Sequence, residues 1–255
     1  MRTHLAAACA ALLLAAPLAA QNPVPADPSP WPQHSLERPR PVVVAPGAFA
    51  PSPPPSDAIL LMNGRSLDRW RATDSAKGPA RWKVIDGYVE IIPGTGGIAT
   101  RDSFGDVQLH VEWKPPVPAV GEGQHRGNSG VFLMETYEVQ VLDSYLNDTY
   151  ADGQAGSLFG QFPPMVNAMR PPSEWQSYDI VFHRPRFSFD GKLVAPGRVT
   201  VFHNGILVQD DQPLLGPTSF GRRAPYEAHI DQLPIELQDH DYKVRYRNIW
   251  VRRLE

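Results

Sequence analysis

Polar side chains that can transfer protons or form hydrogen bonds recur at every second position of several segments. Because side chains alternate across a strand, each such set would lie on one face of a β-strand, opposite an aliphatic face. The sets are Gln108, His110 and Glu112 in 107–113; Glu138 and Gln140 in 137–143; Glu236, Gln238 and His240 in 235–240; and Lys243, Arg245 and Arg247 toward the C-terminus.

These residue types suit proton transfer and the binding of hydroxyl groups. Imidazole and carboxyl groups can move protons near neutral pH, whereas amide and guanidinium groups hydrogen-bond to hydroxyls. Each desolvated hydroxyl needs a partner, so we expect the polar faces to converge in one hollow that binds a polyhydroxyl ligand such as a sugar. The alternative is the solvated outer face of a half-buried sheet. The use of Glu, Gln, His and Arg in place of Lys, Thr and Ser argues against that alternative.

The aromatic residues and two further polar residues each have two interpretations. Tryptophans either stack on sugar rings or belong to the core. Asn128, within Gly127-Asn128-Ser129-Gly130, either directs its amide into the mouth of the hollow or belongs to a plain turn. Asp143 ends its strand and either faces that mouth or a cation, or caps the loop 144–148. The tryptophans concerned are Trp82, Trp113, Trp175 and Trp250.

No metal site is predicted from the spacing of possible ligands. Asp231, Asp239 and Asp241 lie near His240 but do not have the spacing of a calcium loop. The histidines His110, His183, His203 and His240 lack the i, i+4 pairing of a helical zinc motif. We expect no cofactor, and the sequence leaves a divalent cation such as calcium open.

The elements that must position these residues are strands. No long window repeats with helical periodicity, and Gly and Pro interrupt every candidate helix. Short strands separated by Asp86-Gly87, Asp190-Gly191 and Asn204-Gly205 predict an antiparallel sandwich or barrel over residues 57–255. The expected strands are Tyr88–Ile92, Val107–Trp113, Gly130–Met134, Tyr137–Leu142, Ser177–His183, Arg198–His203, Ile206–Val208, Ile235–Gln238 and Lys243–Arg252.

Two segments precede this domain. Residues 1–20 have basic residues, then an apolar run and small residues at the end, which predicts a cleaved signal peptide; a retained membrane anchor is the alternative. Cys9, the only cysteine, lies inside that segment in a position unsuited to lipidation. Residues 21–56 contain 12 of the 28 prolines, and we expect a disordered linker there.

Composition narrows the class of protein. The net charge is −3 with both signs scattered, so we expect no nucleic acid partner. No segment after the signal is long and apolar enough to cross a membrane, which takes roughly 20 residues. The sequence predicts an exported protein, periplasmic or extracellular.

Several motifs in order resemble a known family, the 3-keto-disaccharide hydrolase domain, across residues 58–254. The resemblance implies a concanavalin-like jelly-roll β-sandwich of two antiparallel sheets. It also implies 3-keto-glycoside substrates that a partner sugar oxidoreductase has oxidised at C3. The motifs are Leu61-Met62-Asn63-Gly64, Trp82, Asp86-Gly87, Phe104-Gly105-Asp106, Leu109-His110-Val111-Glu112-Trp113, Gly127-Asn128-Ser129-Gly130-Val131, Tyr137-Glu138-Val139-Gln140-Val141-Leu142-Asp143, Glu174-Trp175-Gln176-Ser177-Tyr178, His203-Asn204-Gly205, Leu237-Gln238-Asp239-His240 and Arg247-Asn248-Ile249-Trp250.

The implied chemistry begins with a C3 ketone, which acidifies the C2 proton and places the C1–O bond β to the carbonyl. A base removes that proton, an oxyanion develops at C3, the aglycone leaves, and water adds to the enone. Strand parity and these motifs give the expected roles. Glu138 and His240 are the catalytic acid and base, Glu112 is a second carboxylate, Arg247 and Gln238 are donors, and Asn128, Gln140, His110 and Asp143 bind substrate.

Two other functions remain open at this stage. Conventional glycoside hydrolysis would use Glu112 and Glu138 as a carboxylate pair. A non-catalytic, lectin-like binding module would need aromatic platforms and hydrogen bonds but no acid–base pair. The presence of Glu112, Glu138 and His240 on the polar faces favours an enzyme.

Overall fold

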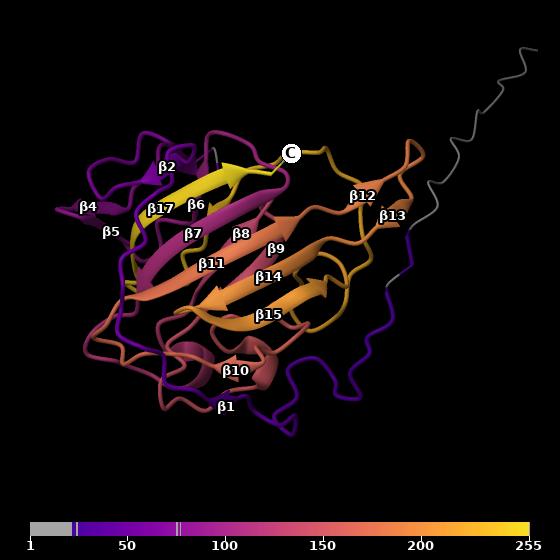
Figure 1. The fold of residues 1–255 in the computed structure, drawn as a ribbon, viewed down its shortest axis with the longest axis horizontal. Helices are drawn as coiled ribbons and strands as arrows, with labels where there is room; N and C mark the ends of the chain where they lie inside the picture. Colours follow the sequence, from indigo (N-terminus) through magenta and orange to yellow (C-terminus); the bar gives the residue numbers. More distant parts are fainter. Residues whose placement is uncertain (1–21, 24, 75, 77, 255) are drawn as a thin grey trace, which may run out of the picture.

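A computed structural model describes residues 22–254, apart from Val24, Ser75 and Lys77 (Figure 1). The expected signal segment 1–20, including Cys9, lies outside the described residues. Within the described part of the chain, no helix is long and apolar enough to cross a membrane. Among the described residues, two short 3₁₀ turns are η2 (Gly123–His125) and η3 (Ala151–Gly153).

Two antiparallel sheets form the body of the molecule. The large sheet has the order β15 (Ile206–Pro213), β14 (Arg198–His203), β11 (Gln176–His183), β7 (Val107–Lys114), β17 (Arg245–Arg253), β5 (Tyr88–Glu90) and β4 (Lys83–Ile85), and β2 (Ile59–Met62) also pairs with β17. The small sheet has the order β3 (Trp70–Ala72), β6 (Ile98–Thr100), β16 (Glu236–Leu237), β8 (Ser129–Leu133) and β9 (Tyr137–Val141). The predicted all-β sandwich of two antiparallel sheets is confirmed.

Two smaller pairings lie outside these sheets. β12 (Arg186–Phe187) and β13 (Leu193–Ala195) form an antiparallel hairpin. β1 (Val42–Val43) pairs in parallel with β10 (Val166–Asn167) and so joins the N-terminal segment to the domain.

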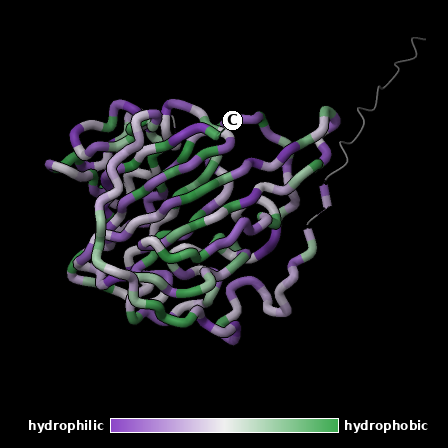
Figure 2. Tube along the Cα trace, in the orientation of Figure 1, coloured by the Kyte–Doolittle hydropathy of each residue, from purple (hydrophilic) through white to green (hydrophobic). Residues whose placement is uncertain are grey.

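The core lies between the aliphatic faces of the two sheets. Leu109 and Val111 of β7 and Val139 of β9 are fully buried, and Figure 2 shows hydrophobic and hydrophilic residues alternating along the long strands. Two tyrosines of the large sheet reach across to the small one. Tyr178 donates a hydrogen bond to the Gln140 carbonyl at 2.7 Å, and the Tyr246 hydroxyl lies 2.7 Å from Ser129 Oγ. These bonds fix β8 and β9 against the large sheet.

The sequence predicts a disordered linker over residues 21–56, and the structure places described residues of this segment against the sandwich. Residues 22–56, here called the strap, run around the edge of the sandwich and contact it along their length (Figure 1). The domain donates hydrogen bonds to strap carbonyls, from Arg170 to Gly47 at 2.7 Å and from Asn248 to Ser52 at 2.9 Å. Proline removes backbone donors but leaves the carbonyl acceptors. Docking through carbonyls produces no apolar periodicity, so the sequence pattern could not show it.

We predict that truncation in the core costs far more stability than truncation at the sheet edge. Leu109→Ala on β7 should lower the free energy of unfolding by about 2–5 kcal/mol, because it leaves a cavity between the sheets. Val84→Ala is the matched control, since Val84 lies on edge strand β4 and is 38% exposed. Urea denaturation measures both, and equal losses in the two variants would contradict this view of the core.

Candidate active site

A hollow of about 310 Å³ opens on the outer face of the small sheet. It gathers several of the residues predicted from strand parity together with an aromatic wall. The lining residues are Asn128, Phe132, Glu138, Gln140, Phe159, Thr218, Ser219, Phe220, Gln238 and His240. Polar groups converging in a concave site are what a small-molecule ligand requires.

Strand register places the predicted residues side by side. Gly130 of β8 pairs with Gln140, and Phe132 pairs with Glu138. On the other side of β8, the backbone nitrogen of Gln238 donates to the Gly130 carbonyl at 3.0 Å, which places Gln238 beside the same glycine. Gly130 has no side chain, and a Cβ built there would lie 2.4 Å from Glu138 Oε1. The glycine therefore leaves the space that the Glu138 carboxyl occupies.

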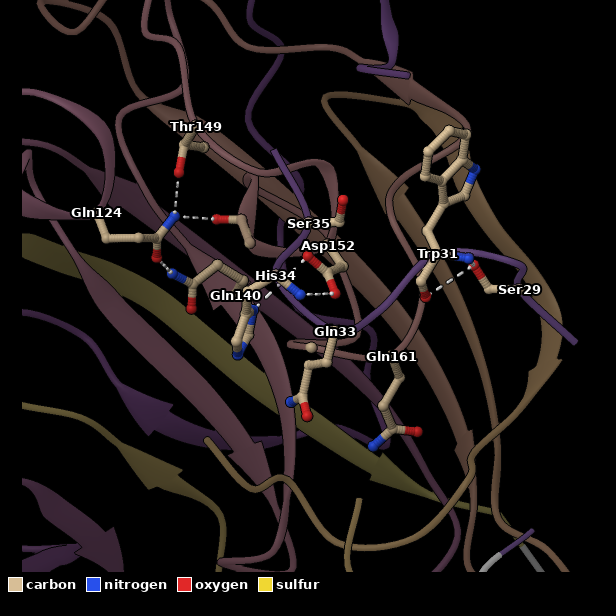
Figure 3. A network of polar contacts seen from close by, with 12 residues as sticks. Ser29, Trp31, Gln33, His34, Ser35, Gln124, Gln140, Thr149, Asp152 and Gln161 are labelled. Atoms are coloured by element: carbon tan, nitrogen blue, oxygen red, sulfur yellow. Dashed lines mark hydrogen bonds and ion pairs between the residues drawn. The ribbon is translucent and has the colours of Figure 1, made fainter. Parts of the chain in front are cut away.

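Amide orientations next to Glu138 can be traced from backbone carbonyls. Gln124 Nε2 donates to the Gly153 carbonyl at 2.8 Å and to Thr149 Oγ1 at 2.9 Å, so Gln124 Oε1 must accept. Asn128 Nδ2 donates to the Gln124 carbonyl at 3.0 Å, so Asn128 Oδ1 must also accept. Gln140 Nε2 lies within reach of both acceptors, at 3.1 and 3.2 Å, and Figure 3 shows its bond to Gln124.

The orientation of the Gln140 amide bears on the protonation of Glu138. With its nitrogen facing Gln124 and Asn128, Gln140 presents its oxygen to Glu138 Oε1 at 2.9 Å. Reversing the Gln140 amide would give Glu138 a donor but would place the amide oxygen against two acceptors. A protonated Glu138 would donate to the Gln140 oxygen, which also lies 3.3 Å from the Ser129 carbonyl oxygen. Burial, assisted by the charge of Glu236, raises the pKa of Glu138 to about 8, in agreement with a neutral carboxyl.

His240 and Gln238 stand at the accessible side of the hollow. His240 is exposed, and its ring lies parallel to Tyr242 with a centroid separation of 6.2 Å. An imidazole at this position can exchange protons with both ligand and solvent. Gln238 Oε1 is buried and has no hydrogen-bond partner in the protein. It is thus a free acceptor for a ligand hydroxyl.

Sequence reasoning missed several residues around Glu138. Thr218 Oγ1 accepts a hydrogen bond from the Glu138 backbone at 2.9 Å. The irregular segment 154–159 runs beside β9, with Gln140 N donating to the Ser157 carbonyl at 3.0 Å, and contributes Phe159 to the lining. Glu236 shares the outer face, and burial raises its pKa to about 7. The alternation of side chains had placed Glu236 on the polar face of its strand, whereas Thr218 and Phe159 lie in loops that show no such alternation.

Asp143 lies in a neighbouring hollow of about 390 Å³, whose lining includes Tyr242 and a proline-rich loop. Consecutive residues line the two hollows, since Gly127 and Asp241 line this one whereas Asn128 and His240 line the first. Asp143 Oδ2 pairs with Arg126 Nε at 2.7 Å, and Oδ1 accepts from the Tyr145 backbone at 3.2 Å. Asp143 thus performs the loop-capping alternative. Among the described residues, no three His, Cys, Asp or Glu side chains group as metal ligands.

His110, Glu112 and Arg247 do not join the hollow, which corrects the expectation that all polar faces converge. β7 and β17 pair within the large sheet, whose polar face lies on the opposite side of the sandwich. Strand parity distinguishes the two faces of a strand but not the sheet to which the strand belongs. The side chains of His110 and Glu112 are only 1% and 2% exposed, so this cluster offers little surface to a ligand.

The separated residues form a buried ion-pair cluster. His110 Nδ1 lies 2.7 Å from Asp179, and Arg247 Nε donates to Glu112 at 2.6 Å. Asn248 bridges Glu112 to the Ser52 carbonyl of the strap. Burial lowers the pKa of His110, but the hydrogen bonds and charges of Asp179 and Glu112 outweigh it and raise the pKa to about 8. Burial disfavours the Glu112 anion, yet its partners hold its pKa below the ordinary value.

We predict a pH-dependent contribution of His110 to stability. Its raised pKa means that the stabilisation is complete below about pH 6.5 and is lost as the pH rises through about 8. The difference of about 1.5 pKa units corresponds to about 2 kcal/mol at most. His110→Gln should remove this part of the pH dependence when unfolding free energies at about pH 6 and about pH 9 are compared with those of the wild type. An unchanged slope would contradict the assignment.

The comparisons with known proteins concern the family and the fold. A family model of the 3-keto-α-glucoside-1,2-lyase-like domain matches residues 57–252. Among solved structures, a "putative glycosyl hydrolase" from Parabacteroides distasonis ATCC 8503 is 42% identical with a TM-score of 0.76, covering 85% of this chain and 93% of its own. A second structure so described from the same organism is 20% identical with a TM-score of 0.53, covering 78% and 94%, and supports the fold alone.

No match was found among curated proteins. The family match begins where the sandwich begins, just after the strap, and extends into the last strand, β17. It therefore includes both sheets and every strand that lines the hollow. This chain belongs to the family of 3-keto-α-glucoside-1,2-lyase-like domains.

Proposed function

We propose that this protein cleaves 3-keto-glycosides, with Glu138 as the general acid and His240 as the general base. Its family and structural relatives make it a glycosyl-hydrolase-like, carbohydrate-active protein. The observation that carries the finer proposal is the buried Glu138 carboxyl, whose Oε1 lies 2.9 Å from the Gln140 side-chain amide in the same hollow as an exposed imidazole. Elimination needs two unlike groups, one that takes a proton and one that gives it.

The proposed reaction proceeds by elimination across C1 and C2. His240 removes the C2 proton, electron density moves to the C3 oxygen, and the resulting enolate expels the C1 oxygen as Glu138 protonates it. Asn128 and Gln238, which line the hollow, would orient hydroxyl groups, and their amide N–H groups would stabilise the developing C3 oxyanion. Water then adds to the enone, so that elimination plus hydration gives net hydrolysis.

Conventional glycoside hydrolysis by Glu112 and Glu138 is disfavoured by their positions. That mechanism needs two carboxyl groups that flank one bond, roughly 5–10 Å apart. Glu112 lies on the outer face of the large sheet under the strap, whereas Glu138 lies on the outer face of the small sheet. A non-catalytic binding module has no use for a neutral acid opposite a base, and the activity assay below distinguishes it.

We also propose the cellular setting expected from the sequence. Residues 1–20 would direct export to the periplasm or the extracellular space. The reaction requires a ketone at C3, so a sugar oxidoreductase must act on the glycoside first. The neighbouring hollow beside Asp143 would receive the leaving group, because residues adjacent in sequence to Asn128 and His240 line it.

Glu138→Gln and His240→Ala should each lower kcat/KM for 3-keto-trehalose by at least about 100-fold, because each removes one proton-transfer step. Release of free glucose is the assay, and Glu122→Gln, on an exposed loop, is the matched carboxylate control. Full activity of both site variants with intact folding would refute the residue roles. Binding of keto-glycosides without any turnover by the wild type would establish a binding module.

The pH profile should report the neutral form of Glu138. With a pKa near 8, the acid is protonated at neutral pH, so kcat/KM should fall as the pH rises above about 8. The charge of Glu236 helps to raise that pKa, so Glu236→Gln should move the descending limb to lower pH. Initial rates across the pH range measure both effects. A limb that stays in place in Glu138→Gln would show that another group is responsible.

A further inference from the structure

One aromatic side chain of the hollow is open to solvent. Phe220 lines the hollow that holds Glu138 and His240, and 78% of its surface is exposed. The other two phenylalanines of the lining, Phe132 and Phe159, are half-buried. A single exposed apolar residue needs no explanation on an open surface, whereas an exposed ring in a concave site is available to cover a ligand. The proton transfers proposed above leave this ring without a role.

The loop that carries Phe220 is fixed, although it belongs to no helix or strand. The Glu138 backbone donates to Thr218 Oγ1 at 2.9 Å. The Ser219 carbonyl accepts a hydrogen bond from Gln33 Nε2 of the strap at 2.7 Å. The loop is therefore tied both to β9, which carries the candidate acid, and to the strap.

The strap supports the Phe220 ring from one side. The His34 ring lies 26° from parallel to it, with the two centroids 5.1 Å apart. His34 is itself held, because its backbone donates to Asp152 Oδ2 at 3.0 Å (Figure 3). Stacking of this kind stabilises the orientation of both rings. The contact still leaves most of the Phe220 ring uncovered.

The domain is shaped to receive the two strap residues that support the loop. Gly160 has φ of +68°, and a Cβ there would lie 2.2 Å from Gln33 Nε2 and 3.1 Å from His34 Cε1. Glycine combines this backbone conformation with so close an approach because it has no Cβ. The support of Phe220 by the strap is thus built into the sandwich.

The tryptophans do not provide an aromatic surface in this site. Of the two interpretations that the sequence leaves open for them, burial holds for Trp82, Trp113 and Trp250, which are at most 3% exposed. Trp175 instead carries the Arg247 guanidinium, 4.0 Å from its ring centroid. None of the six tryptophans, all of which lie among the described residues, lines the hollow. An aromatic platform here must therefore come from phenylalanine.

The lining combines the two chemistries that a pyranose ring presents. A sugar has C–H groups on the faces of its ring and hydroxyl groups around its edge. The C–H groups carry partial positive charge and are attracted to the negative face of an aromatic ring, whereas desolvated hydroxyls need hydrogen-bond partners. Phe220 offers the first kind of contact, and Asn128, Gln238 and His240 offer the second within the same hollow.

We propose that Phe220 is a substrate-binding residue, whose ring stacks against the C–H face of the sugar in the hollow. His34 is a positioning residue that holds this ring and does not touch the sugar. The inference rests on the proposed function, because it identifies the surface of the same hollow that binds the sugar ring. The strap then influences the affinity for substrate through the orientation of Phe220.

Phe220→Leu tests the proposal, because it keeps an apolar side chain and removes the flat face. We expect KM for 3-keto-trehalose to rise about tenfold with kcat within about twofold, since stacking is a ground-state contact. Phe220→Trp, which restores an aromatic face, should raise KM less. Phe189→Leu is the matched control, because Phe189 is fully exposed in the turn between β12 and β13 and does not line the hollow. An unchanged KM in Phe220→Leu would overturn the proposal.

Two strap variants of the full chain test the positioning role of His34. His34→Ala should raise KM about fivefold, because it removes the ring behind Phe220. His34→Phe keeps a ring at that place and should therefore raise KM less than His34→Ala does. Equal KM values in the two variants would refute the positioning role.

A measurement without turnover separates this inference from the proposed function. In saturation-transfer NMR, the aromatic protons of the protein are irradiated and the signal of trehalose, which lacks the C3 ketone, is recorded. Transfer to the C–H protons of trehalose in the wild type and in Phe189→Leu, reduced in Phe220→Leu, supports the stacking contact even if no keto-glycoside is cleaved. The absence of transfer in the wild type, or equal transfer in Phe220→Leu, overturns it.

Discussion

The aliphatic faces of two sheets can leave water only by packing against each other, and this constraint arranges everything else in the molecule. It directs Leu109 and Val139 toward the same core and sends the polar side chains of their strands to opposite outer surfaces. The Tyr178 and Tyr246 hydroxyls then fix β8 and β9 at defined positions. The hollow is a consequence of this packing, because its floor is the outer face of strands whose inner face is core.

Local alternation made the fold and half of the candidate site predictable from the sequence. Glu138, Gln140, Gln238 and His240 meet as expected because Glu138 and Gln140 lie on β9 of the small sheet, and Gln238 and His240 follow β16 of the same sheet. His110 and Glu112 obey the same alternation, yet strand pairing places β7 in the other sheet, and pairing depends on contacts between segments far apart in the sequence. The loops that carry Phe159 and Thr218 have no period at all, so only the folded chain brings them to Glu138.

Glu112 and Glu138 lie on opposite outer faces of the sandwich, and their different surroundings shift the pKa values of two identical side chains in opposite directions. Glu112 receives bonds from Arg247 and Asn248, which stabilise its anion and make it a structural ion. Glu138 faces an amide oxygen and is buried next to a second carboxylate, which disfavours its anion. Glu112 therefore helps to hold the large sheet to the strap, whereas the surroundings of Glu138 raise its pKa to about 8.

The strap contacts both outer faces of the sandwich, and this docking explains its proline-rich composition. Its Ser52 carbonyl covers the Glu112 cluster, while His34 and Gln33 reach the wall of the hollow on the other side. A segment without regular secondary structure loses much conformational entropy on docking. Proline reduces that loss because a proline-rich chain has fewer conformations before it docks. Twelve prolines between residues 21 and 56 therefore favour a docked strap over a free tether. The proline content from which the sequence predicts disorder therefore lowers the entropic cost of docking the strap.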